Sequence, residues 1–212
     1  HALDQNRAAF VHFNVGVLTT LAHEHLDYHK SMINYAKAKF KLLQQATFAV
    51  APAVGLDETI KEAVGFGDLQ KKLTTFGLEK GDLNQKDWKL SLSMPGDFNM
   101  LDALAAAAAT QLVGVKKEVI KKSLATFEGL QGRFEEIPTK KDFRIVIDFA
   151  HKPDALEGVI KAASQQIKGK GRIIVMYGLA SQRDTLKRPI MGEISGRLAE
   201  ITVLTDEDPR FE

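Results

Sequence analysis

The sequence has 212 residues, of which 44% are hydrophobic and 26% charged, as expected for a globular protein that can bury a core. Its 29 basic and 27 acidic residues leave a net charge of +2, which gives no reason to expect nucleic acid or a membrane as a partner. The absence of cysteine excludes a disulfide scaffold, thiol catalysis and cysteine-ligated zinc, and it is compatible with the cytoplasm.

Neither end of the sequence has the features of a natural terminus. There is no initiator methionine, and residues 1–4 lack the basic and then apolar pattern of a signal peptide. No apolar run is long enough to span a bilayer. We therefore expect an internal piece of a longer protein, without membrane insertion.

Residues 1–137 are predicted to form an α/β domain. Ser31 is a candidate N-cap for a helix with an apolar stripe, and the alanine run 105–109 favours a second helix. Residues 57–90 contain short strands and turns. The expected helices cover 31–45, 100–112 and 116–127, and the expected strands cover 15–20, 48–54 and 89–94.

The polar segment 138–142 is the candidate domain boundary, after which the pattern becomes β-α-β-α-β. Strands are expected over 144–149, 172–177 and 201–205, and helices over 154–166 and 189–199. Strands that alternate with helices favour parallel pairing with right-handed crossovers. Residues 138–212 are therefore predicted to form a second α/β domain.

A histidine-rich segment follows the first predicted strand. His23, His25 and Asp27 would share a face if the segment were extended, because alternate residues then point the same way. This pattern suits zinc or another transition metal. The alternative is a solvated loop that happens to be rich in histidine.

Three further groups have both a functional and a structural interpretation. Lys39 could belong to a site or to the solvated basic face of an amphipathic helix. Asn99 and Asp102 lie at a helix start, where free N–H groups could donate to an anion or a ring edge, or simply to a capping side chain of Asp97 or Asn99. Arg133 could bind a phosphate bidentately or form a surface pair with Glu135.

Polar residues also follow the strands predicted after residue 138. They are Asp148 with His151, Arg183 with Asp184, and residues 206–210. The carboxyl ends of parallel strands meet at one sheet edge, where ligands bind in open sheets. Three such groups predict a binding crevice there.

Taken in order, these segments resemble the Mur ligase family, specifically its tripeptide-synthetase branch. The match runs from the first residue to the last and is weakest over 55–90. Its motifs here are His1-Ala2-Leu3-Asp4-Gln5-Asn6-Arg7, Leu18-Thr19-Thr20, His25-Leu26-Asp27-Tyr28-His29, Tyr35-x-x-Ala38-Lys39, Gly96-x-Phe98-Asn99, Gly132-Arg133-x-Glu135, Asp148-x-Ala150-His151-x-Pro153-Asp154, Arg183-Asp184-x-x-Lys187-Arg188-Pro189 and Asp208-Pro209-Arg210. The resemblance implies part of the family's central ATPase domain over 1–137, followed by part of its Rossmann-like C-terminal domain over 138–212.

The resemblance also implies an activity and a location. The family's cytoplasmic ligases use ATP to add a third residue to UDP-N-acetylmuramoyl-L-Ala-D-Glu in peptidoglycan precursor synthesis, through an acyl phosphate. Magnesium ions are implied because a carboxylate and a triphosphate repel each other. In the family, the histidine at the position of His25 binds magnesium, and the lysine at the position of Lys39 is carbamylated and becomes an oxygen ligand.

Other functional positions of the family fall on residues of both predicted domains. Arg7 would contact the UDP-muramoyl substrate, Asn99 and Asp102 would lie near adenine, Arg133 near the phosphates, Asp148 near the ribose, and Arg183, Asp208 and Arg210 in the amino-acid pocket. The resemblance implies meso-diaminopimelate rather than L-lysine, because Arg210 could bind its distal carboxylate bidentately.

The sequence also departs from the family pattern. The family's Gly-rich phosphate loop and uridine-binding domain have no counterpart here, so the chain alone is expected to lack ligase activity. Thr20, Glu24, Asp102, Lys152 and Asp208 differ from the family motifs. Two other interpretations stay open: a catalytically dead homologue that serves as a structural or interaction module, and a related folylpolyglutamate or cyanophycin synthetase.

Overall fold

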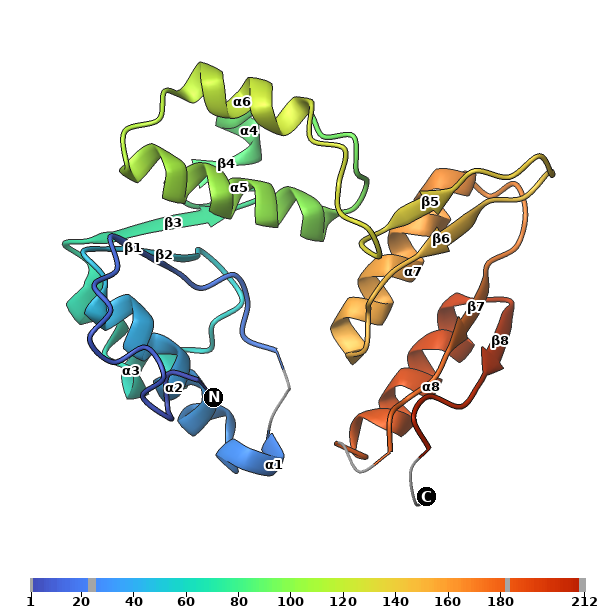
Figure 1. The fold of residues 1–212 in the computed structure, drawn as a ribbon, viewed down its shortest axis with the longest axis horizontal. Coiled ribbons are helices and arrows are strands. Elements are labelled where there is room, and N and C mark those ends of the chain that lie inside the picture. The colour runs from blue at the N-terminus through green and yellow to red at the C-terminus, as the bar shows by residue number, and fades with distance from the viewer. Residues whose placement is uncertain (1, 23–25, 182–183, 210–212) are drawn as a thin grey trace. The chain divides into compact units, whose positions relative to one another are not determined.

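The structure is a computed structural model that describes residues 2–22, 26–181 and 184–209 (Figure 1). The chain forms two compact units. Unit 1 comprises His1–Ser93 and Phe98–Phe127, and unit 2 comprises Met94–Asp97 and Glu128–Glu212. The expected boundary at residue 138 follows strand β5 (Glu135–Ile137), which pairs with β6 (Ile145–Ile147). Because this hairpin belongs to unit 2, the compact units divide earlier in the chain.

Unit 1 is built on a four-stranded parallel sheet in the order β1-β2-β3-β4. Its strands are β1 (Val15–Val17), β2 (Phe48–Pro52), β3 (Leu73–Gly77) and β4 (Leu83–Asn84). Its helices are α1 (Leu26–His29), α2 (Met32–Gln45), α3 (Glu58–Ala63), the 3-10 helix η1 (Phe66–Leu69), α4 (Gln85–Trp88), α5 (Asp97–Leu112) and α6 (Lys117–Ala125).

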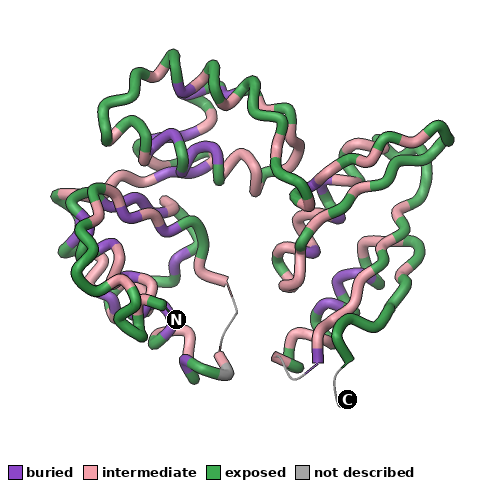
Figure 2. Tube along the Cα trace, viewed as in Figure 1, coloured by how far each residue is buried: buried purple, intermediate pink, exposed green. Residues whose placement is uncertain are grey.

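The sheet of unit 1 is buried on both faces. Along β2, Val50 packs into one core with α4, α5 and α6, whereas Ala49 and Ala51 pack into the other core with α2 and α3. Successive strand residues point to opposite faces, so a strand covered on both sides is apolar throughout. Figure 2 shows this burial along the strands, and Figure 1 shows helices on either side of the sheet.

Helices α2 and α5 form for different local reasons. The expected N-cap of α2 is confirmed, because Ser31 Oγ accepts a hydrogen bond of 3.2 Å from the Asn34 backbone N–H. The alanines of α5 combine high helix propensity with small side chains, and Ala105, Ala107 and Ala108 are buried against the sheet. Helix α2 packs on one face of the sheet, and helix α5 packs on the other.

The strand expected over 89–94 is wrong. Helix α4 ends at Trp88, and Lys89 has a left-handed φ of 49°. The side chain of Gln85 then binds both backbone groups of Leu90, donating to its carbonyl at 2.8 Å and accepting from its N–H at 3.0 Å. Because a side chain occupies these backbone groups, Leu90 makes no ladder with a neighbouring strand.

Unit 2 combines two short sheets with two helices. Strands β7 (Ile174–Tyr177) and β8 (Ile201–Leu204) pair in parallel, and helices α7 (Pro153–Ile167) and α8 (Lys187–Leu198) form one core with the inward-facing residues of β7. The opposite face of β7 and β8 is apolar and exposed, with Ile174 opposite Ile201 and Met176 opposite Val203.

The pairing expected for the first strand of this domain is wrong. Parallel pairing is confirmed for β7 and β8, but β6 pairs antiparallel with β5. No strand was predicted from the sequence at the position of β5. Across the hairpin, Arg144 donates to both carboxylate oxygens of Glu136, through its Nε at 2.7 Å and through its Nη2. This charge-assisted pair stabilises the register.

Asp4 ties the N-terminal segment to α1 and α2, and this contact should depend on pH. Its carboxylate accepts hydrogen bonds from Lys41 Nζ at 3.1 Å and from the Tyr28 hydroxyl at 3.2 Å, which lower the pKa of Asp4. Because folding lowers this pKa, the contact stabilises the folded state fully above about pH 3.9, the ordinary pKa of an Asp carboxyl. That stabilisation is lost as the pH falls through the lower pKa of the folded state. NMR titration of the Asp4 carboxyl should give a midpoint below the ordinary value. Lys41→Met should raise the midpoint, and an equal midpoint in both proteins would contradict the assignment.

No helix among the described parts of the chain is both long and apolar enough to cross a membrane.

Candidate functional site

Lys39 lies on α2 and reaches back to the segment that follows β1. Its Nζ donates a hydrogen bond of 2.9 Å to the carbonyl oxygen of Thr20 and lies 4.9 Å from the centre of the Tyr35 ring. Tyr35 and Lys39 are four residues apart and therefore share one face of the helix. The buried ring of His29 lies 5.2 Å from that of Tyr35. Tyr35 thus contacts both Lys39 and His29, and Thr20 accepts a hydrogen bond from Lys39.

The described residues do not by themselves form a metal site. An ammonium group only donates hydrogen bonds, so Lys39 could bind a metal only after conversion to a carbamate. Among the side chains that the structure describes, which do not include those of Glu24 and Asp27, no group of three or more His, Cys, Asp or Glu could hold a metal ion. His25 and His23 lie outside the described residues. The backbone of Asp27 lies in α1, so the extended stretch considered as one way to bring it beside His23 and His25 does not continue to this residue.

Asn99 and Asp102 lie in the first turns of α5, after Gly96 with its left-handed φ of 99°. Desolvation raises the pKa of the Asp102 carboxyl above its ordinary value. The carboxylates of Asp97 and Asp102 make the start of this helix unfavourable for an anion. They suit a ring that carries N–H donors, such as the amino group of adenine.

The loop that carries Arg133 is held by carboxylates. Asp148, which follows β6, accepts hydrogen bonds from the N–H of Phe134 at 2.8 Å and from that of Ala150 at 2.7 Å. Glu135 accepts a bond of 2.7 Å from the N–H of Gly132. Asp148 therefore holds the loop that carries Arg133, and the roles expected for the two residues at a nucleotide stay predictions.

The side chain of Arg133 makes one contact that the sequence did not predict. Its guanidinium carbon lies 4.8 Å from the centre of the Phe149 ring. The centres of the Phe149 and His151 rings lie 5.2 Å apart in an edge-to-face arrangement. The surface pair proposed between Arg133 and Glu135 is absent from the described residues. Phe149 directly follows Asp148 in the sequence, and that position was the available signal.

The loops that follow the strands of unit 2 are joined by hydrogen bonds. Lys187 Nζ donates to the carbonyl of His151 at 2.8 Å, and the N–H of Ser181 donates to the carbonyl of Asp208 at 3.3 Å. The carboxyl ends of β7 and β8 thus meet near Asp208, as expected for parallel strands. Arg183 and Arg210 lie outside the described residues.

The remaining predicted residues lie in unit 1. Arg7 is exposed in the N-terminal segment, where its N–H donates to the carbonyl of Ala2 at 2.9 Å. Lys39 belongs to a helix on one face of the sheet, and Asn99 and Asp102 belong to a helix on the other. The structure brings none of these residues together in a single pocket of unit 1.

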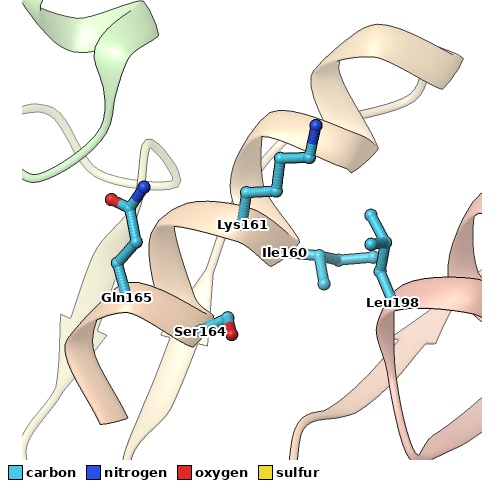
Figure 3. Close-up of a pocket in the computed structure, with 5 residues that line it drawn as sticks. All are labelled: Ile160, Lys161, Ser164, Gln165 and Leu198. Atoms are coloured by element: carbon cyan, nitrogen blue, oxygen red, sulfur yellow. The ribbon is translucent and has the colours of Figure 1, made fainter. Parts of the chain in front are cut away.

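A small hollow in unit 2 contains none of the predicted site residues. Ile160, Lys161, Ser164, Gln165 and Leu198 line it, and its volume is about 210 Å³ (Figure 3). Figure 3 shows Ile160 and Leu198 facing each other between α7 and α8, where both pack into the same core. Small-molecule sites usually occupy about 300–1,000 Å³ and contain convergent polar groups. We therefore assign no ligand to it.

Comparison with known proteins places this arrangement in a family. The Mur ligase middle domain matches residues 1–110, and the Mur ligase glutamate ligase domain matches residues 132–212. The chain belongs to the Mur ligase family. The resemblance drawn from the sequence motifs is therefore confirmed, together with the α/β fold.

Curated Mur ligases match the chain over its whole length. UDP-N-acetylmuramoyl-L-alanyl-D-glutamate–2,6-diaminopimelate ligase of Alkaliphilus metalliredigens is 37% identical over 235 residues and covers 100% of this chain. A ligase of the same description from Clostridium acetobutylicum is 35% identical over 233 residues. The chain spans 46% and 47% of these relatives, about half of their length.

Solved structures show the same fold. A UDP-N-acetylmuramoyl-L-alanyl-D-glutamate–2,6-diaminopimelate ligase superposes with a TM-score of 0.62 at 24% identity, covering 100% of this chain and 47% of that one. MurC of Thermotoga maritima gives a TM-score of 0.68 at 23% identity, over 91% of this chain and 46% of its own. Folylpolyglutamate synthase of the same organism gives 0.61 at 13%, over 91% and 47%. These likenesses concern the fold.

Proposed function

We propose that this chain is part of a Mur ligase that uses ATP to add meso-diaminopimelate to UDP-N-acetylmuramoyl-L-alanyl-D-glutamate. The observation that carries the proposal is the 37% identity over the full chain to a ligase of that description. The likeness to folylpolyglutamate synthase, at 13% identity, is a likeness of fold alone. We accordingly propose the peptidoglycan precursor as the substrate, the cytoplasm as the location, and no role in nucleic acid binding.

The proposed reaction has two steps. A carboxylate oxygen of the dipeptide attacks the γ-phosphorus of ATP, and ADP leaves with the electrons of the broken P–O bond. The amine of diaminopimelate then attacks the carbonyl carbon of the acyl phosphate, loses a proton and expels phosphate. Magnesium, supplied with ATP, would neutralise charge on the phosphates. Since the described residues do not complete a metal site, no step is assigned to a metal held by them.

We assign roles to residues according to their chemistry and their neighbours. Arg133, held above Phe149, would bind a phosphoryl group, and Asp148 would hold its loop while accepting a hydrogen bond from the ribose. Asn99 would donate to or accept from the adenine edge, and the Asp102 carboxylate would accept from its amino group. Lys39 and His25 would act near the reacting phosphate, Arg7 would bind the UDP-muramoyl substrate, and Arg183, Asp208 and Arg210 would bind the amino acid.

The test is phosphate release by the full-length ligase with ATP, magnesium and the UDP-muramoyl dipeptide. Release should depend on meso-diaminopimelate and be much weaker with L-lysine, because L-lysine lacks the second carboxylate that a guanidinium binds bidentately. Arg210→Gln should lower kcat/KM for diaminopimelate and leave that for L-lysine nearly unchanged. The 212-residue chain alone, the matched control, should release no phosphate.

Preference for L-lysine would retain a ligase but overturn the pocket assignment. If nucleotide binds and no acceptor supports release, the catalytically dead homologue becomes the better interpretation.

A further inference from the structure

Phe149 holds the side chain of Arg133 although it belongs to no core cluster. The ring is 63% exposed, and the guanidinium carbon of Arg133 lies 4.8 Å from its centre. A phenylalanine this exposed adds little to folding stability through burial. Its ring face does attract a cation, and a guanidinium stacks on such a face with its N–H groups free at the rim.

The backbone around Arg133 is fixed by separate contacts. Glu135 accepts from the N–H of Gly132 before it, and Asp148 accepts from the N–H of Phe134 after it. Phe134 itself is buried, with a left-handed φ of 45° that these contacts maintain. Two carboxylates therefore fix the backbone of the loop, and Phe149 fixes the direction of the Arg133 side chain.

The charge of Arg133 is not compensated within the described chain. No described carboxylate forms an ion pair with it, and no described acceptor receives a hydrogen bond from its guanidinium. Asp148 and Glu135, the carboxylates of this loop, instead accept hydrogen bonds from backbone amides beside Arg133. A guanidinium that is held in place with its donors unused is prepared for an external anion of matching geometry, such as a phosphoryl group.

We propose that Phe149 is a positioning residue that aligns Arg133 for a phosphoryl group of ATP. This inference rests on the proposed function, which supplies the nucleotide. Loss of a partly exposed cation–π contact corresponds to a change of about twofold to fivefold in affinity. We therefore expect Phe149→Leu to raise the Kd and KM for ATP by about twofold to fivefold, with a smaller change in kcat.

The decisive experiment is a double-mutant cycle in the full-length protein. The ATP dissociation constant is measured by calorimetry, together with KM and kcat, for wild type, Phe149→Leu, Arg133→Gln and the double variant. If Phe149 acts through Arg133, Phe149→Leu should have no further effect once Arg133→Gln is present. Phe149→Tyr retains the ring face and should bind ATP as wild type does. Phe143→Leu removes an aromatic ring of similar exposure in the same unit and is the matched control.

The outcomes separate this inference from the proposed function. Equal ATP affinity of wild type and Phe149→Leu would overturn the inference, as would additive effects in the double variant. Nucleotide binding with the expected non-additivity but no ligation would support the positioning role and count against the ligase assignment.

Discussion

Lys39→Ala should lower the turnover of the full-length ligase by about two to three orders of magnitude, the effect of removing one preorganised charged group from a reacting centre. Lys39→Arg should be as inactive, if the lysine acts as a carbamate. Arginine keeps the positive charge and the donors, but it is always protonated and does not offer the neutral primary amine that CO₂ requires. The Arg variant therefore separates a modified lysine from one that acts as a cation.

The measurement is phosphate release at saturating substrates, with Lys37→Ala and Lys37→Arg as matched controls on the same helix. Lys37 is exposed and should tolerate both changes. Raising the bicarbonate concentration should increase wild-type activity if the lysine is only partly carbamylated, and should not rescue either Lys39 variant. Substantial activity of Lys39→Arg would overturn the carbamate assignment and leave Lys39 as a cation.

The sequence predicted the regular parts of the fold because local and tertiary signals agree there. Ser31 caps α2 as expected, and the alanine run forms the buried face of α5. Predictions failed where particular side-chain contacts determine the backbone conformation. Gln85 binds both backbone groups of Leu90 and prevents a strand, and the contact between Arg144 and Glu136 supports a hairpin that a polar segment does not suggest. Such contacts join particular atoms and leave no periodic pattern.

The candidate site divides in the same way. Residue type and position were enough to single out Asp148, which follows a predicted strand, and Arg133, which lies in a predicted loop between the domains. The contacts that make Arg133 useful involve Phe149 and backbone amides, and neither is marked by composition or spacing. For Lys39, the sequence could not show that the carbonyl of Thr20 and the ring of Tyr35 would hold the amine.

Phe40→Ala should lower the free energy of unfolding of unit 1 by about 3–5 kcal/mol. Phe40 directly follows Lys39 on α2, but its side chain is 0% exposed and packs in the core between α2, β2 and α3. Its ring lies 6.0 Å from that of Phe66. Truncation removes this apolar surface and leaves a cavity among residues that α2 and the sheet hold apart. Domains are usually stable by about 5–15 kcal/mol, so the loss would leave unit 1 marginal.

Urea unfolding of the 212-residue chain can be followed through the single tryptophan, Trp88, which is buried in unit 1. Its fluorescence therefore reports on the unit that the substitution changes, even if the two units unfold separately. Phe143→Ala removes the same ring from an exposed position of unit 2 and should leave the Trp88 transition within about 0.5 kcal/mol of wild type. Equal urea midpoints for Phe40→Ala and Phe143→Ala would contradict the core assignment. Lys39→Ala should leave the Trp88 transition near that of wild type. Its loss of activity would then come from chemistry and not from unfolding, because the adjacent residues Lys39 and Phe40 serve the site and the core separately.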